Sequence, residues 1–492
     1  MSQVEQLQNE ISALSSGNPI YTDMYSTWEY LLESYMGGQS YKDGQHLTKY
    51  QLENASEYAA RLNQTYLDNH CKSVVSVYNS FLFRQNPTRN LGNLESLSET
   101  QAFLKDADFD GRSLNQFMKD VATYSSIFGH TWIILVKPSV GATTRADEQL
   151  SGARPYANLI TPLSMLDWNW HRQPNGAYVL NYIRYIEDIN GNTRTIKEWT
   201  MDTVTTYTVV TDSITHKQEL VNRVEEPNQL GKIPAICAYN AKGPVRGIGI
   251  SDLQDIAGAQ KMIFNLTSEL EETIRLDSHP SIVATPDTIL GNGAGSVVQV
   301  PGDLDPGLKP YLLQYNGASV KSILDSIDSI VNSIDKMANT GAVRATESKT
   351  LSGVAMETEF QLLNARLSEK GDNMELAEEQ LWKCFAEYYD REFDGVIDYP
   401  DSFNIKDTHN EFGQLETAGK TANDPRIKRL IDERIVELLD EDVQSVLPEI
   451  AFEPHIMYDA EGNAFLARTE ADHLDMQSKG YTHDKPTQTV GN

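Results

Sequence analysis

The chain has 492 residues, of which 40% are hydrophobic and 23% charged, a composition typical of a globular protein with roughly two or three domains. Its formal net charge at pH 7 is −29, because 70 acidic residues outnumber 41 basic ones. A protein that binds nucleic acid tightly neutralises phosphates with Lys and Arg, so this deficit argues against tight DNA binding and allows a surface that repels DNA.

The cysteines and the N-terminus indicate the compartment. Cys71, Cys237 and Cys384 are far apart and odd in number, which favours reduced thiols and argues against a structural zinc site. Residues 1–18 are polar, unlike a signal peptide, and the longest apolar run, 132–136, is too short to cross a bilayer. We therefore expect a soluble intracellular protein with no metal and no cofactor.

The N-terminal region is expected to be helical over residues 20–83, with a break at Gly37-Gly38 and one longer helix over 47–83. Asn86-Pro87 closes this region. Tyrosines and arginines are frequent here, as in helices that pack laterally and keep polar tips in water.

Residues 106–111 resemble the opening of an EF-hand calcium loop, but the twelfth position holds Phe117 where a bidentate Glu is required. We therefore expect an ordinary turn that leads to an N-cap at Ser113. The helix that follows ends at Gly129, and a strand is expected over 131–137.

Residues 156–239 have the pattern of an antiparallel meander. Asn175-Gly176 and Asn190-Gly191 are strong hairpin signals, and a further short strand is expected over 235–239. His171 and His216 have no partner at metal-ligand spacing and are expected at the surface. The meander strands are expected over 157–160, 165–170, 178–186, 193–200 and 203–210.

Two helices with narrow apolar stripes flank a small β-leaning segment, residues 281–315. Ser251 or Asp252 can cap the first helix, which continues to about Ile274. The glycine-rich loop at 291–296 is followed by neither a helix nor Gly-Lys-Ser/Thr, so a phosphate-binding loop is excluded. The stripe of the second helix, within 317–338, consists of Val320, Ile323, Ile327, Ile330, Ile334 and Met337, with Ser and Asp between them.

The rest of the chain begins with an aperiodic, turn-prone stretch, residues 339–350. A helix capped by Ser352 is then expected to run to about Asp390. Further on we expect a helix over 425–441, strands over 448–457 and 465–467, and a disordered tail over 477–492.

This order of elements resembles the portal proteins of tailed bacteriophages. Gly249-Ile250-Ser251-Asp252-Leu253 is similar to the start of their first stem helix, and residues 281–315 to their clip. Residues 339–350 are similar to their tunnel loop, and 351–357, Leu-Ser-Gly-Val-Ala-Met-Glu, to the start of their long wing helix. The resemblance covers roughly residues 28–441.

The resemblance implies an α+β fold that is portal-like and mainly helical. It would have an antiparallel β wing region, two stem helices flanking a small β clip, and a long wing helix. The parts would be an N-terminal wing (1–246), a first stem helix (247–280), a clip (281–316), a second stem helix (317–338), a tunnel loop (339–351), a long wing helix (352–395), a crown or C-terminal region (396–476) and a disordered tail (477–492).

The resemblance also implies a function without catalysis. A dodecameric ring at one capsid vertex would let double-stranded DNA pass during packaging and ejection, without sequence specificity. Its partners would be the terminase motor, a head–tail adaptor, and major capsid and scaffolding proteins, with no membrane. The protein would lie in the virion, and in the host cytoplasm during assembly.

The expected site residues fall into three groups, for each of which the alternative is a solvated surface position with no specific role. Arg344, Glu347 and Lys349 would lie on the tunnel loop nearest the DNA. The acidic stem residues Glu269, Glu272, Asp325 and Asp328 would line the channel. Asp287, Asn292, Asp303 and Asp305 would dock the motor and the adaptor.

Two other classes of protein remain as alternatives. A hydrolase lacks support, because no Gly-x-Ser-x-Gly elbow, His-Glu-x-x-His helix or phosphate-binding loop is present. A non-viral coiled-coil scaffold or adaptor with an α/β head would explain the apolar stripes but not the small β segment between them.

Overall fold

The fold is described from a computed structural model of the chain. It covers residues 11, 13–14, 16–138, 147, 150–278, 281–286, 288–289, 299–300, 302–303, 305–313, 317–344, 353–400, 403, 415, 417–420, 425–438, 455–459, 463–467, 476 and 479–481. The chain divides into two compact units, residues 1–404 and 405–492, which are described separately.

The first unit opens with four helices: α2 (Pro19–Met36), α3 (Gly38–Asp43), α4 (Ala55–Gln64) and α5 (His70–Leu82). Gly37 separates α2 from α3 with a φ of 65°, so the expected break is confirmed. The expectation of one helix over 47–83 is wrong, because Asn54 and Asn69 cap separate helices with their side chains.

The next segment contains β1 (Thr88–Asn90), α6 (Ser98–Lys105), α7 (Leu114–Phe128) and β2 (His130–Val136). Ser113 and Gln116 form the expected capping box of α7, and Gly129 ends the helix with a φ of 89°. A Cβ at Gly129 would lie 2.4 Å from the carbonyl oxygen of Gly249, so no larger residue fits there. In the EF-hand-like loop, Asp108 pairs with Arg112, and no metal-binding group of His, Cys, Asp or Glu occurs among the described residues.

Two antiparallel sheets follow. The expected meander is confirmed for β4 (Met165–Arg172), β5 (Tyr178–Asn190), β6 (Thr193–Thr200) and β7 (Thr203–Thr211), and it has a fifth strand, β8 (Gln218–Pro227), that was not expected. The expectation that residues 157–160 belong to the meander is wrong, because they pair with β2 in the second sheet. The second sheet has the order β3-β2-β9, from β3 (Tyr156–Ile160) and β9 (Ala235–Tyr239) on either side of β2. His171 and His216 are exposed, as expected.

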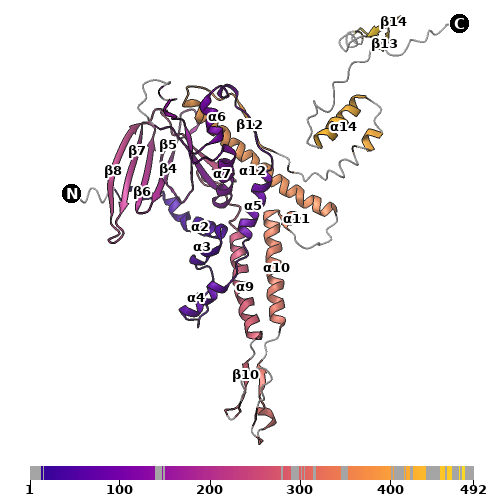
Figure 1. Ribbon diagram of the computed structural model, residues 1–492. Helices are drawn as coiled ribbons and strands as arrows, with labels where there is room; N and C mark the ends of the chain where they lie inside the picture. The colour runs from indigo at the N-terminus through magenta and orange to yellow at the C-terminus, as the bar shows by residue number, and fades with distance from the viewer. Residues whose placement is uncertain are drawn as a thin grey trace, which may run out of the picture. The chain divides into compact units, whose positions relative to one another are not determined.

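Two long helices then lie side by side and carry a small hairpin at their far end (Figure 1). They are α9 (Ile256–Ser278) and α10 (Ala318–Ala338), and the hairpin pairs β10 (Ser281–Val283) with β11 (Tyr311–Leu313). α9 begins after Ser251 and Asp252, so the expected N-cap is wrong. The hydroxyl of Ser251 donates instead to the carbonyl oxygen of Ile127 at 2.6 Å, which ties the helix entrance to the end of α7.

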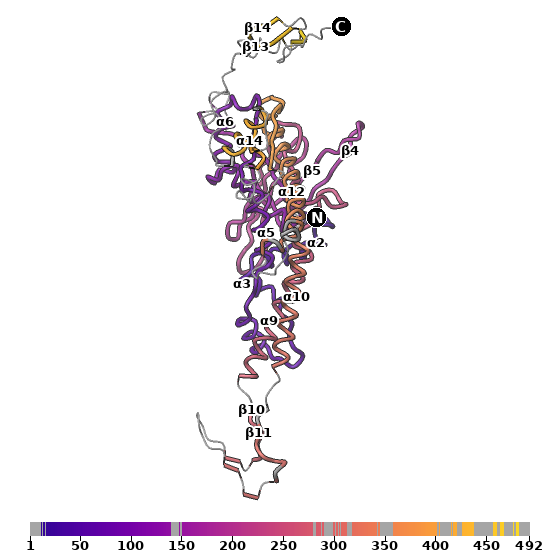
Figure 2. The backbone as a smooth tube through the Cα atoms, turned by 90° about the vertical axis from the view of Figure 1, so that its right-hand side faces the viewer, coloured from indigo at the N-terminus to yellow at the C-terminus, as the bar shows by residue number. Residues whose placement is uncertain are grey.

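A short helix, α11 (Gly341–Arg344), and the longest helix of the chain, α12 (Gly353–Glu387), complete the first unit with β12 (Val396–Asp398). Both views show α12 crossing the helix-rich core (Figure 1, Figure 2). Its Leu363, Leu367, Leu381 and Trp382 are fully buried in that core. β12 pairs antiparallel with β1 and joins chain segments about 300 residues apart.

The second unit contains α14 (Pro425–Leu438) and an antiparallel pair, β13 (His455–Tyr458) and β14 (Ala464–Ala467). The expected helix and the two strands around a turn are therefore confirmed. Most of the expected tail, 477–492, lies outside the described residues, as does the cap at Ser352. Across the described part of the chain, no helix combines the length and hydropathy needed to span a membrane.

Candidate functional site

Arg344 is the only tunnel-loop candidate that lies among the described residues; Glu347 and Lys349 lie outside them. Its guanidinium forms an ion pair with Asp335 of α10 at 2.8 Å and donates to Nδ1 of His70 at 2.6 Å. Only 11% of the side chain is exposed. Arg344 therefore fastens the start of the loop to α5 and α10 within the same chain.

His70 accepts this hydrogen bond because its ring is neutral. Burial lowers the pKa of His70, and the adjacent Arg344 cation lowers it further against the opposing effect of Asp68. A protonated ring would place a second cation beside the guanidinium. The contact between Arg344 and His70 is therefore suited to a permanent structural role.

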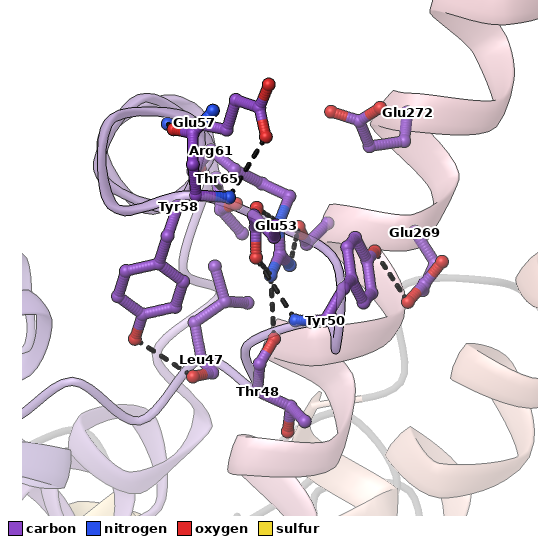
Figure 3. Close-up of polar contacts among 12 residues, drawn as sticks. Leu47, Thr48, Tyr50, Glu53, Glu57, Tyr58, Arg61, Thr65, Glu269 and Glu272 are labelled. Carbon is purple, nitrogen blue, oxygen red and sulfur yellow. Dashed lines mark hydrogen bonds and ion pairs between the residues drawn. The ribbon is translucent and has the colours of Figure 1, made fainter.

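Glu269 and Glu272 lie on the side of α9 that faces the segment around α4 (Figure 3). The hydroxyl of Tyr50 donates to Glu269 at 2.7 Å, and burial together with this hydrogen bond raises the pKa of Tyr50 to about 12. Glu272 forms an ion pair with Arg275 one turn further along α9. Both carboxylates are thus engaged by neighbouring groups of their own chain.

Arg61 of α4 holds this segment against α9. It forms a bidentate pair with Glu53, with both N–O distances at 2.8 Å, and donates to the hydroxyl of Ser268 at 3.0 Å. Its guanidinium also lies 3.9 Å from the centre of the Tyr50 ring. A cluster of polar contacts therefore covers one side of α9.

Asp325 and Asp328 are exposed on α10, and no side-chain partner is seen for either among the described residues. Figure 1 shows α4 and α10 on opposite sides of α9. The structure therefore does not bring the four predicted stem carboxylates onto one face. Asp325 and Asp328 form one exposed pair, whereas Glu269 and Glu272 face α4.

The predicted docking residues are only partly described. Asp303 and Asp305 are exposed near the hairpin, and Asp305 accepts a hydrogen bond from the backbone N–H of Gly307 at 2.9 Å. Asp287 and Asn292 lie outside the described residues. At least one of these four side chains thus also has a local structural role.

A buried ionic cluster that was not predicted joins α12 to the start of α9. The carboxylate of Asp252 lies 2.6 Å from Nζ of Lys370 and 2.8 Å from Nη2 of Arg366, and it accepts from the side chain of Asn240 at 3.0 Å. Lys370 Nζ also donates to the hydroxyl of Ser126 at 3.0 Å. In the sequence, only the (i, i+4) spacing of Arg366 and Lys370 indicates this cluster. That spacing does not show which carboxylate pairs with the two cations.

A second unpredicted cluster holds the other half of α12. Glu378 is fully buried and forms a bidentate pair with Arg89 of β1, while Tyr399 donates to it at 2.7 Å and Trp382 at 3.2 Å. A buried carboxylate is tolerated only when its oxygens are paired in this way. The long helix α12 is thus held in place by two buried ionic clusters, one in each half of the helix.

The family described as phage portal protein, SPP1 Gp6-like, matches residues 25–416. The chain belongs to this family. Portal proteins are structural rather than enzymatic. The buried ionic clusters of this portal protein each join α12 to another part of the chain, which is a structural role.

Solved structures with a similar chain come from gene transfer agent particles. One is the neck of an empty particle computed with C6 symmetry, with 9% identity and a TM-score of 0.43, covering 78% of this portal chain and 95% of that chain. Another is the virion of a native particle, with 10% identity and a TM-score of 0.41, covering 74% and 89% respectively. No curated protein matches the chain.

Proposed function

We propose that this portal protein assembles into a dodecameric ring at one capsid vertex, through which double-stranded DNA passes during packaging and ejection. This proposal is supported mainly by the exposure of the α10 side chains to solvent in the single chain. Of the described side chains on that helix, only Ile334 and Ala338 are buried. The stripe residues Val320, Ile323, Ile327 and Ile330 are only half-buried. A helix whose apolar stripe is only partly covered by its own chain suits lateral packing against copies of itself.

Exposed apolar side chains on the helix pair support lateral packing. Met262 and Ile274 of α9 are 56% and 47% exposed, and Leu324 and Met337 of α10 are 45% and 41% exposed. We propose that these residues belong to the surface that packs against neighbouring copies. In the proposed ring, α9 and α10 are the stem helices, the β10–β11 region is the clip and α12 is the long wing helix.

The proposed channel face follows from charge. Asp325 and Asp328 are the stem residues best placed to repel DNA, because their carboxylates are exposed and unpaired by described side chains. Glu269 and Glu272 would instead fasten the α4 segment to the stem. In the loop we propose that Arg344 is the anchor and that Glu347 and Lys349 lie closest to the DNA.

The proposed partners follow from the same arrangement. The clip, with Asp287, Asn292, Asp303 and Asp305, would dock the terminase motor and later the head–tail adaptor. The wing would contact major capsid and scaffolding proteins. The ring would form in the host cytoplasm and remain at the portal vertex of the virion.

The test is the state of the purified chain. We expect electron micrographs to show closed particles with a central hole, and sedimentation to give one species near 660 kDa, about twelve times the 55.1 kDa chain. The chain should be examined alone and together with the capsid and scaffolding proteins of its phage. Only monomers or dimers over a wide concentration range, under both conditions, would overturn the proposal.

A further inference from the structure

A cavity of about 510 Å³ lies where β4, β5, β9 and α12 meet in the first unit. The side chains of β9 alternate: Ile236 and Ala238 are buried in the core, whereas Ala235, Cys237 and Tyr239 line the cavity. The cavity is therefore built on the outer face of the β3-β2-β9 sheet. None of the predicted site residues lies in it.

Its charge is opposite to that of the rest of the molecule. Lys232, Lys242 and Arg246 line the cavity, and no Asp or Glu does. Lys232 pairs with Glu387, but Lys242 and Arg246 have no carboxylate partner among the residues that the structure describes. In a chain with a net charge of −29, two uncompensated cations at one cavity mark a place for an anionic group.

Arg246 is held in position by aromatic rings. Its guanidinium lies 4.0 Å from the ring centre of Tyr178 and 5.5 Å from that of Trp170. Stacking fixes the plane of the guanidinium and leaves its N–H donors available for a carboxylate. The indole N–H of Trp170, another lining residue, is buried without a hydrogen-bond partner among the described residues.

Apart from Asn373 and Gln380 of α12, the remaining walls are mainly apolar. Leu180 and Ile233 form part of the buried wall, while Leu376 of α12 is 54% exposed beside them. A ligand that fits these walls combines carboxylates with a bulky apolar side chain. A polynucleotide fits less well, because a chain with a net charge of −29 repels a long polyanion more strongly than a short peptide with a few carboxylates.

We propose that this cavity binds a peptide segment of a partner protein, one that carries at least two carboxylates and one Leu, Ile or Phe side chain. The carboxylates would contact Arg246 and Lys242, and the apolar side chain would pack against Leu376 and Ile233. The cavity lies within one chain, so this proposal goes beyond the ring and does not depend on it.

The probe is a displayed library of random twelve-residue peptides, selected on the purified full chain. We expect the enriched peptides to combine Asp or Glu with a large apolar residue. A synthetic copy of the most enriched peptide should bind the Arg246→Gln/Lys242→Gln variant about tenfold or more weakly, measured by fluorescence anisotropy. Lys105→Gln/Lys217→Gln makes the same charge change at exposed positions away from the cavity and should bind like the original chain.

Leu376→Asp provides a second variant that leaves Arg246 and its stacking intact. It places a negative charge beside the cavity and should also weaken binding about tenfold. The proposal is overturned if no peptide is enriched, if the enriched peptides have no excess of acidic residues, or if the variants bind like the control. It is also overturned if the original chain binds no peptide while the cavity variants block assembly into rings, since the cavity would then receive a neighbouring copy.

Discussion

Asp252 has a carboxylate of which only 2% is exposed, and both of its oxygens are engaged by cations. Among the described residues, Asp252 is the carboxylate that forms an ion pair with Lys370, at 2.6 Å. Removing one member of such a buried pair leaves the other charge desolvated and unpaired, which costs far more than the pair itself contributes. The stability of the joint between α9 and α12 therefore depends on this residue.

Asp252→Asn is expected to lower the free energy of unfolding by about 3–5 kcal/mol, because Lys370 remains buried without its counter-charge. Urea unfolding at one protein concentration measures the change. The matched control is Asp188→Asn, an exposed position on β5, which should change the free energy by less than about 0.5 kcal/mol. Equal losses for the two variants would show that the ionic cluster has no special role.

The contribution of Asp252 to the free energy of unfolding should also depend on pH. Burial alone would raise the pKa of this carboxyl, but Lys370 and Arg366 outweigh burial and hold the pKa below its ordinary value of 3.8. A group with a lowered folded-state pKa stabilises the fold above its unfolded-state pKa, and that contribution is lost as the pH falls through the folded-state pKa.

The stability difference between the original chain and Asp252→Asn should therefore be constant from neutral pH down to about pH 5 and shrink below 3.8. Urea unfolding repeated across this pH range measures it. A difference that grows on acidification would contradict the assigned direction of the pKa shift.

Helix α10 differs along its length in how much of it the chain itself covers. Near its C-terminal end Ile334 is fully buried, whereas Leu324, nearly three turns earlier, is 45% exposed. The buried end contributes to the fold of one chain, and the exposed part is available to a neighbouring copy. Truncation of each residue separates these two roles.

Ile334→Ala should destabilise the single chain by about 2–5 kcal/mol, because it removes packed methyl groups and leaves a cavity. Leu324→Ala should change the stability of the dissociated chain by less than about 0.5 kcal/mol, yet shift sedimentation from rings toward smaller species. Urea unfolding and sedimentation velocity measure the two effects. If Leu324→Ala left ring formation unchanged, this part of α10 would not lie at the contact between subunits.

Charge acts at the scale of the whole molecule. DNA sliding through a ring requires walls that do not exchange their counterions for phosphates, and a chain with a net charge of −29 meets that requirement. In the proposed ring, each carboxylate of α10 occurs once in every subunit. A substitution that changes the charge of one chain therefore changes the charge of the channel wall once per subunit.

Asp325→Lys/Asp328→Lys should convert the ring into one that retains duplex DNA at about 50 mM salt and releases it at about 200 mM. Fluorescence anisotropy with a labelled duplex measures retention. Glu219→Lys/Glu226→Lys makes the same charge change on the exposed strand β8 and should retain less DNA. Equal retention by both variants would mean that net charge alone, rather than a channel face on α10, controls DNA contact.

The elements that could be predicted from the amino-acid sequence are those whose signals are local. Apolar spacing predicted α10 and α12, the Asn-Gly pairs predicted hairpins of the meander, and Ser113 predicted the start of α7, because each signal lies within a few residues of its effect. The sequence did not show that Asn69 begins a separate helix, because a single capping residue is a weak signal inside a long apolar pattern.

Contacts between residues far apart in the sequence could not be predicted and are known only from the folded chain. Asp252 reaches Lys370 across 118 positions, and Glu378 reaches Arg89 across 289, and no spacing in the sequence relates them. The same holds for β9, which pairs with β2 rather than with the meander that precedes it. Local patterns depend on the period of one helix or strand, whereas buried charge pairs and the cavity between β9 and α12 exist only once separate elements have packed together.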